Sequence, residues 1–227
     1  MRTVSLITAA VVMMIFATVG CESGTNPPPG DLRERLARAL DPVDAERATL
    51  VRDEQRTSLT ELPTAWLRGW LMIDVLHRGA QHPLRFNVAL SDEDRAVVLN
   101  RNPEGFNEVV RDSAQPDAGR AADVARTFLD TTRDFRKWAY RVESTGDITW
   151  LPKPDARQAA ARDELIKRFA DQIQPPEPRP VDAGWAMVLW VVDGTELARH
   201  EVTVAEDGTV TSIAAVVASA LPVPDSI

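Results

Sequence analysis

The sequence is poor in cysteine and in basic residues, and each shortage excludes a class of protein. Cys21 is the only cysteine among 227 residues, so the chain cannot form an internal disulfide. Lysine and arginine together number 26 against 34 acidic residues, which gives a formal charge of −8. That balance argues against binding to DNA or RNA and against electrostatic adsorption to anionic lipid.

Sequence signatures of catalysis and nucleotide binding are missing as well. The chain contains no G-x-S-x-G nucleophile elbow, no G-x-x-x-x-G-K-[ST] phosphate loop and no G-x-G-x-x-G turn. No spacing typical of a calcium loop occurs either. We therefore expect no cofactor and no metal site, and we name no catalytic residue.

Long apolar runs are also scarce, and the only one lies at the N-terminus. Residues 4–20 carry no charge, follow Arg2 and end in small residues before Cys21, which is the layout of a secretory signal. At 17 residues, the run is at the short limit for a helix that crosses a bilayer.

The order Thr18-Val19-Gly20-Cys21 resembles the lipobox of bacterial lipoprotein precursors. This resemblance covers only the first 21 residues. It implies that Cys21 is acylated, that residues 1–20 are removed, and that the protein is held by lipid at the cell membrane or outer membrane, outside the cytoplasm. An uncleaved N-terminal anchor and a soluble secreted protein are the alternatives.

The next segment, residues 22–30, contains three consecutive prolines with glycine, serine and asparagine, and we predict a tether there. Residues 31–227 then form a single predicted α+β domain. Two charged helical segments, 31–40 and 41–56, are divided by Asp41-Pro42 and are expected at the surface.

The middle of the chain predicts a β-hairpin followed by helices. Residues 65–78 and 84–90 form the two strands, with Leu67, Leu71, Ile73 and Val75 on one face of the first. Ser91 opens a predicted short helix over 91–100, and a second begins near residue 102. An amphipathic helix follows over 117–137, with an apolar stripe from Ala121 to Phe135.

The C-terminal half alternates strand, helix and strands. A strand over 138–144 is expected to continue through 147–151, and a helix after Pro154 carries Ala161, Leu165, Phe169 and Ile173 on one stripe. Three strands around the Asp-Gly turns at 193–194 and 207–208 then form a meander. The whole predicts one mostly antiparallel sheet with helices on one face, a layout similar in element order to cystatin-like and NTF2-like proteins.

Treating each Asp-Gly as a two-residue loop predicts the register of the meander. Met187 then lies opposite His200, and His200 lies opposite Ala215. One face becomes nearly all apolar and is expected to carry both amphipathic helices; its members are Trp185, Met187, Leu189, Val191, Ala198, His200, Val202, Val204, Ile213 and Val217. The reverse face is expected to be partly solvated or to meet a partner.

His200, Trp185 and Met187 are the candidate pocket residues, because His200 is the titratable side chain on that apolar face. A buried, hydrogen-bonded core histidine is the structural alternative. His77 and His82 flank a predicted turn and are expected to be exposed. The six tryptophans are explained by core packing, with a sugar-stacking platform as the alternative.

These observations lead to three hypotheses for the exported domain. The first is a non-enzymatic lipoprotein that binds an envelope protein or a small ligand, with no nucleic acid among its partners. The second is an envelope enzyme with a pocket around His200, and the third is a structural subunit of an envelope complex.

Overall fold

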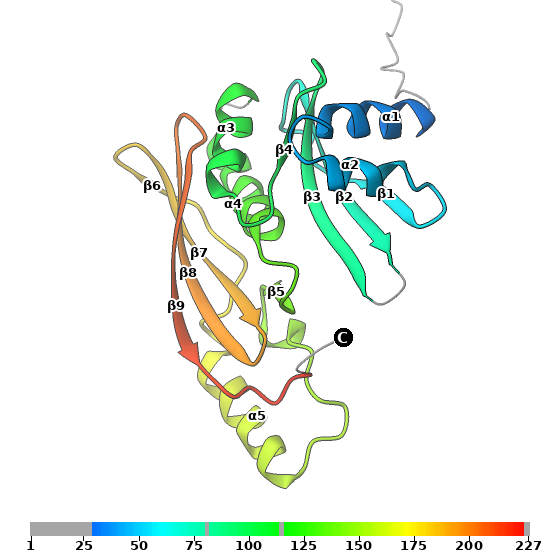
Figure 1. Cartoon of the computed structure of the whole chain (residues 1–227). Helices are drawn as coiled ribbons and strands as arrows, with labels where there is room; N and C mark the ends of the chain where they lie inside the picture. The colour runs from blue at the N-terminus through cyan, green and yellow to red at the C-terminus, as the bar shows by residue number, and fades with distance from the viewer. Residues whose placement is uncertain (1–28, 80–81, 114–115, 225–227) are drawn as a thin grey trace, which may run out of the picture.

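The computed structural model describes residues 29–79, 82–113 and 116–224 and confirms the α+β class with antiparallel strands (Figure 1). The strands divide between two sheets, where the sequence predicted one.

Helix α1 spans Pro29–Leu40, so the predicted tether is too long by two residues. Pro29 opens the helix because a proline at the first helical position costs no hydrogen bond. Cys21 and the rest of the tether lie outside the described residues.

The N-terminal sheet has the strand order β1-β2-β3-β4. Its strands are β1 Thr57–Glu61, β2 Trp70–Arg78, β3 Pro83–Ser91 and β4 Ala96–Val98. The predicted hairpin is confirmed from Trp70 onward, with Ile73 opposite Val88 and Val75 opposite Phe86. Both pairs point to the face that Leu71 shares. Residues 65–69 were predicted in the first strand but precede it, and Leu67 is buried in a different core cluster.

Helices α1 and α2 cover this face. The prediction placed them at the surface, but each also buries side chains against the sheet. Helix α2 spans Ala45–Arg52 and is capped by Asp44, whose side chain accepts the Arg47 N–H, rather than by Asp41. Leu36, Leu40 and Val51 are fully buried against the sheet. A few apolar residues suffice on α1 because Leu32, Leu36 and Leu40 recur every four residues on one stripe, while α2 buries Ala48 and Val51, one turn apart.

The predicted helix over 91–100 was also wrong. Ser91 ends β3, and residues 92–95 form a turn into β4. The Ser91 hydroxyl accepts the Arg95 N–H at 3.0 Å, and Asp94 adopts a left-handed φ of 59°. Serine and acidic residues are common at helix starts, but here they form a hairpin turn. The Ala-Val-Val segment that follows pairs with β3 as a strand.

Two helices lie between the sheets (Figure 1). They are α3, Pro103–Ser113, and α4, Ala118–Thr132, and Asp117 caps α4. Both were predicted, but α4 ends five residues before the predicted helix, so Phe135 lies beyond it. Val124 and Phe128 of α4 share one buried cluster with Met72 of the first sheet and Val202 of the second. The two sheets are therefore joined through a common core.

The C-terminal sheet has the order β5-β7-β8-β9, with β6 paired to β7. Its strands are β5 Ala139–Val142, β6 Arg179–Val181, β7 Gly184–Asp193, β8 Glu196–Ala205 and β9 Val210–Ala218. The predicted extension of β5 through 147–151 is absent from the described structure, because Thr145–Asp147 forms a 3₁₀ turn. The Asp147 carboxylate accepts the N–H groups of Glu143 and Ser144 there.

The register of the meander differs from the predicted one at both turns. At the first turn Asp193 pairs with Glu196, which leaves Gly194 and Thr195 as the loop. Gly194 has φ +58° and is the only one of the two with positive φ, as in a type II′ turn, which takes glycine first. This moves the pairing by two residues, so His200 faces Leu189 instead of Met187, while every side chain keeps its predicted face.

At the second turn the observed pairing differs from the predicted pairing by one residue. Residues 206–208 form a three-residue loop closed by Ala205 and Thr209, with Gly208 at φ +86°. His200 therefore faces Ala214 rather than Ala215. A one-residue slip exchanges the faces of a strand, so Ile213 and Val217 lie on the reverse face, and Ile213 is 72% exposed.

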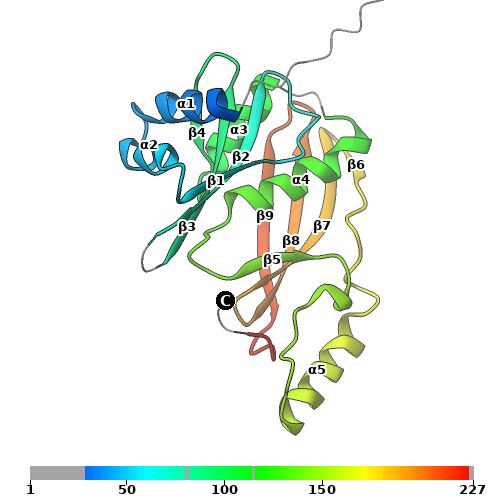
Figure 2. The same ribbon diagram turned by 90° about the vertical axis from the view of Figure 1, so that its right-hand side faces the viewer.

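Helix α5, Ala156–Phe169, begins at the reciprocal cap of Asp155 and Gln158. It was predicted on the same face as α4, but it lies toward the lower end of the molecule (Figure 2). Its C-terminal Phe169 packs against Trp190 of the reverse face, with ring centroids 5.8 Å apart. Ile173, which lies beyond the helix, joins the same cluster.

Candidate functional site

A cavity of about 470 Å³ lies on the α4 side of the C-terminal sheet, beyond the end of α4. Its floor is formed by Val191, Ala198 and His200 of the two central strands and continues onto β9. Phe128 and Leu129 of α4 form one wall. The cavity exists because α4 ends at Thr132, before the meander does, and leaves the distal part of the apolar face uncovered.

His200 lies on this floor, half-buried, with its Nδ1 3.0 Å from the Ser212 hydroxyl of β9. Burial lowers the pKa of His200, and the charge of Asp193, across the cavity floor, opposes that effect. Asp193 lines the cavity, but no ion pair within 4.0 Å joins it to His200 among the described residues. The imidazole is therefore neutral at pH 7 and is held by one hydroxyl.

Charged side chains form the rim of the cavity. Arg133 and Lys137 supply positive charge, and Asp193 and Glu196 supply negative charge. None of the four is in an ion pair with another described residue. Arg133 stacks over the Phe135 ring at 4.4 Å, and burial lowers the pKa of its guanidinium.

Other rim charges are already neutralised. Arg136 donates two side-chain hydrogen bonds and its backbone N–H to Asp134 and lowers the pKa of that carboxyl to about 2. Arg141 donates to Asp130 at 2.9 Å and to Glu143 at 2.9 Å. These groups shape the rim and are not free to bind a charged ligand.

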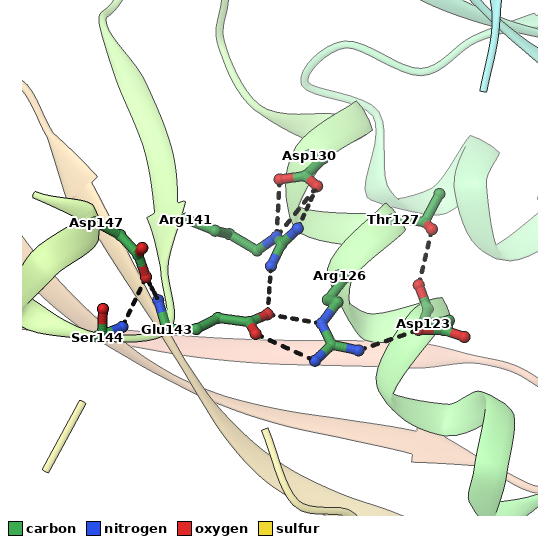
Figure 3. A network of polar contacts seen from close by, with 8 residues as sticks. All are labelled: Asp123, Arg126, Thr127, Asp130, Arg141, Glu143, Ser144 and Asp147. Atoms are coloured by element: carbon green, nitrogen blue, oxygen red, sulfur yellow. Dashed lines mark hydrogen bonds and ion pairs between the residues drawn. The ribbon is translucent and has the colours of Figure 1, made fainter. Parts of the chain in front are cut away.

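Figure 3 shows the network that holds this wall. Arg126 of α4 donates to Glu143 just beyond β5, at 2.7 Å, and to Asp123 at 3.0 Å, and Arg141 connects the same Glu143 to Asp130. The network fixes strand β5 against α4. Ala139 and Tyr140 are thereby positioned in the cavity lining.

A second hollow of about 1100 Å³ lies on the reverse face, beside the segment from Pro175 to Val181. Although it is larger, its lining strand β6 is exposed at all three positions. Its central charges, Arg199 and Glu201, pair with each other. We regard the His200 cavity as the better site because α4, β5 and the strands of the meander enclose it and its central polar groups, His200 and Ser212, are half-buried.

The three predicted pocket residues do not come together. Only His200 lines the cavity. Met187 is buried among the core residues under α4, and Trp185 packs at the edge of that cluster. The two-residue shift at the first turn explains this result, because it moves both residues along the strand away from His200.

The other two histidines differ in burial. His77 was predicted to be exposed, but it is buried on β2 with its Nδ1 2.9 Å from the Thr57 hydroxyl. It belongs to the strand, so its face and not the nearby turn decides its burial. His82 is exposed as predicted. Within the described ranges, no three His, Cys, Asp or Glu side chains cluster closely enough to hold a metal ion.

The tryptophans support the core-packing explanation. Trp66, Trp70 and Trp190 are at least 92% buried in the apolar clusters, and Trp150 and Trp185 pack beside them. Trp138 lies next to Tyr140 with ring centroids 5.5 Å apart. No exposed row of rings results among the residues that the structure describes.

Sequence reasoning missed Ser212, Arg133 and Tyr140. Ser212 was assigned to the reverse face by the one-residue register error. Arg133 falls inside the helix predicted over 117–137, but it lies just past the end of α4. The type of loop at Gly208 was the signal that would have placed Ser212 beside His200.

No helix in the described part of the chain is long and apolar enough to cross a bilayer. No protein-family model matches the sequence, and neither a curated protein nor a solved structure shows significant similarity to it.

Proposed function

We propose that this chain is a bacterial lipoprotein, anchored through Cys21, whose exported domain binds a partner molecule in the His200 cavity without chemical conversion. The observation that carries the proposal is the cavity itself. Its volume of about 470 Å³ falls within the range of small-molecule sites, about 300–1,000 Å³. It combines an apolar floor with unpaired charges of both signs at the rim.

The lining indicates the chemistry of the ligand. Val191 and Ala198 on the floor and Phe128 on the wall favour an apolar group deep in the cavity. Arg133 and Lys137 favour an anionic group at one side of the rim. A small amphipathic molecule, or an apolar side chain of an envelope protein next to an acidic residue, satisfies both requirements. Because the end of α4 and the strands of the C-terminal sheet position the pocket, it is preformed.

Binding is tested by titrating the full chain with an anionic apolar dye, anilinonaphthalene sulfonate, and following its fluorescence. Val191→Trp fills the cavity and should weaken dye binding at least tenfold. Val188→Trp is the matched control, because Val188 is an equally half-buried valine of β7 on the opposite face. Equal binding by both variants would contradict the proposal.

The anchor is tested separately by metabolic labelling with a fatty-acid analogue. The wild-type chain should incorporate the label and Cys21→Ser should not. Unchanged labelling of Cys21→Ser would contradict acylation at this residue, whatever the outcome of the dye experiment.

One observation favours a second function, acyl transfer or hydrolysis. The 3.0 Å contact between Ser212 and His200 resembles a nucleophile and its general base. His200 would accept the hydroxyl proton as Ser212 attacks a carbonyl carbon. Labelling by a fluorophosphonate that disappears in Ser212→Ala would support this function, and an unlabelled wild-type chain would exclude a reactive serine.

A further inference from the structure

Strand β9 is the one long edge strand in the described part of the molecule. It spans nine residues, Val210–Ala218, while the other edge strands, β1, β4, β5 and β6, have three to five. Natural sheets protect long edges with charge, proline or a covering element. Strand β9 contains no charged residue and no proline, and Ile213 and Val216 are 72% and 55% exposed.

The outward backbone groups of β9 can be assigned from its hydrogen bonds. The Thr209 carbonyl points toward β8, where it accepts the Ala205 N–H. The N–H and C=O groups of Val210 point away from β8 and bond to the Asn107 side chain of α3. Since direction alternates along a strand, Ser212, Ala214 and Val216 also point their N–H and C=O groups outward. No described residue bonds to these six groups.

We propose that a second copy of this chain pairs with β9 in antiparallel fashion, with Ala214 opposite its own counterpart. Outward residues must pair with outward residues. The register centred on Ala214 places Ser212 opposite Val216 of the other copy. The outward N–H and C=O groups of Ser212, Ala214 and Val216 are then all hydrogen-bonded. Registers shifted by two leave one of them unpaired or reach Val210, which Asn107 already occupies.

Side-chain size and charge support a second copy as the occupant. In this register each large side chain meets a small one: Val216 meets Ser212, and Ile213 meets Ala215. A chain of charge −8 normally repels itself, but the uncharged strand brings no like charges into direct contact. The pairing covers the two exposed large apolar side chains of the strand, Ile213 and Val216.

The pairing has a consequence for the cavity. A two-fold axis through Ala214 stands perpendicular to the sheet, so both copies present the same face to the same side. Ser212, Ala214 and Val216 line the cavity. The two cavities therefore open side by side across the axis. This inference does not depend on what the cavity binds.

Disulfide formation tests the register. In the full chain carrying Cys21→Ser, Ala214→Cys places two thiols on Cα atoms about 5.5 Å apart, which suits a disulfide. Thr211→Cys is the control, because Thr211 is also exposed on β9 but lies about 20 Å from its counterpart in this register. Ala214→Cys should form a covalent dimer at least tenfold faster than Thr211→Cys.

Sedimentation equilibrium tests the association itself. The wild-type chain should show a concentration-dependent dimer, and Ala214→Pro should remain a monomer. Proline removes only an outward N–H there, so the circular dichroism spectrum and thermal midpoint should be retained; Ala214→Ser should still dimerise.

Two results would overturn the proposal: equal crosslinking of the two cysteine variants, or a wild-type chain that stays monomeric up to about 1 mM. If the thiol introduced by Ala214→Cys is protected from alkylation only when another protein is added, the edge belongs to that partner and the self-pairing is wrong.

Discussion

At the scale of single residues, His200 is the side chain whose charge state the fold controls. Burial lowers its pKa below that of the unfolded chain, so the folded protein prefers the neutral imidazole. Asp193 opposes the shift without reversing it. The cavity is therefore sensitive to pH through one titratable group near its centre.

A pH dependence of stability follows from this shift. As the pH falls below the ordinary histidine pKa of about 6.5, the unfolded chain binds a proton before the folded chain does, and folding loses free energy. Wild type should therefore lose more stability between pH 7.5 and pH 5.5 than His200→Gln does. The measurement is urea unfolding at both pH values. A larger loss in His200→Gln would show that the sign is wrong.

Gly184 provides a second test at this scale. It has φ +145°, and a Cβ there would lie 2.2 Å from the Val204 carbonyl oxygen. Gly184→Ala should destabilise the protein by about 3 kcal/mol or more, through strain and collision together. Gly194→Ala, at φ +58° with open space around it, should cost about 1–2 kcal/mol. Similar losses for both variants, measured by chemical denaturation, would contradict the role of the close approach.

At the scale of elements, α3 is joined to β9 by one side chain. Asn107 donates to the Val210 carbonyl at 3.0 Å and accepts the Val210 N–H at 2.8 Å, across 103 positions of sequence. The amide side chain takes the place of a neighbouring strand. It closes one end of the exposed edge and connects the helix pair to the meander.

Asn107→Ala removes both hydrogen bonds and should cost about 1–3 kcal/mol of unfolding free energy. The loss should be accompanied by faster hydrogen exchange of the Val210 amide. Arg111→Ala, one turn later and exposed, should change stability by less than about 0.5 kcal/mol. A protected Val210 amide in Asn107→Ala would indicate that another group supports this end of β9.

The helices and strands with strong periodicity were predictable from the sequence, and the loops that set their relations were not. The apolar stripe of α4 and the alternation in β7 and β8 predicted both the elements and their buried faces. An Asp-Gly pair, however, fits more than one loop type. The pairing of the flanking residues distinguishes them: Asp193 with Glu196 at the first turn and Ala205 with Thr209 at the second. The division into two sheets escaped prediction because alternation shows which face is buried and not which strands are neighbours.

At the scale of the whole molecule, both sheets depend on α4. Its buried side chains, including Val124 and Phe128, contact residues of both sheets within one cluster. If α4 unfolds, the face of each sheet that packs on it becomes exposed to water. We therefore expect the two sheets to unfold in a single transition.

Val124→Ala should lower the free energy of unfolding by about 2 kcal/mol and destabilise both sheets equally. Hydrogen exchange of β2 and β7 amides, taken with tryptophan fluorescence, reports the two sheets separately. Val43→Ala, at a 57% exposed position, should have little effect. Loss of protection in one sheet alone would contradict a shared unfolding unit.

Strands β7, β8 and β9 follow α4 in the sequence, and this order has a consequence for how the protein is made. Synthesis delivers the chain from the N-terminus, so the first sheet and α4 are complete while residues 184–218 are still missing. Until those strands arrive, the side of α4 that packs on the C-terminal sheet faces water. A product that stops before residue 184 therefore presents a permanent apolar helix face to proteases and chaperones, and late nonsense mutations should be as damaging as early ones.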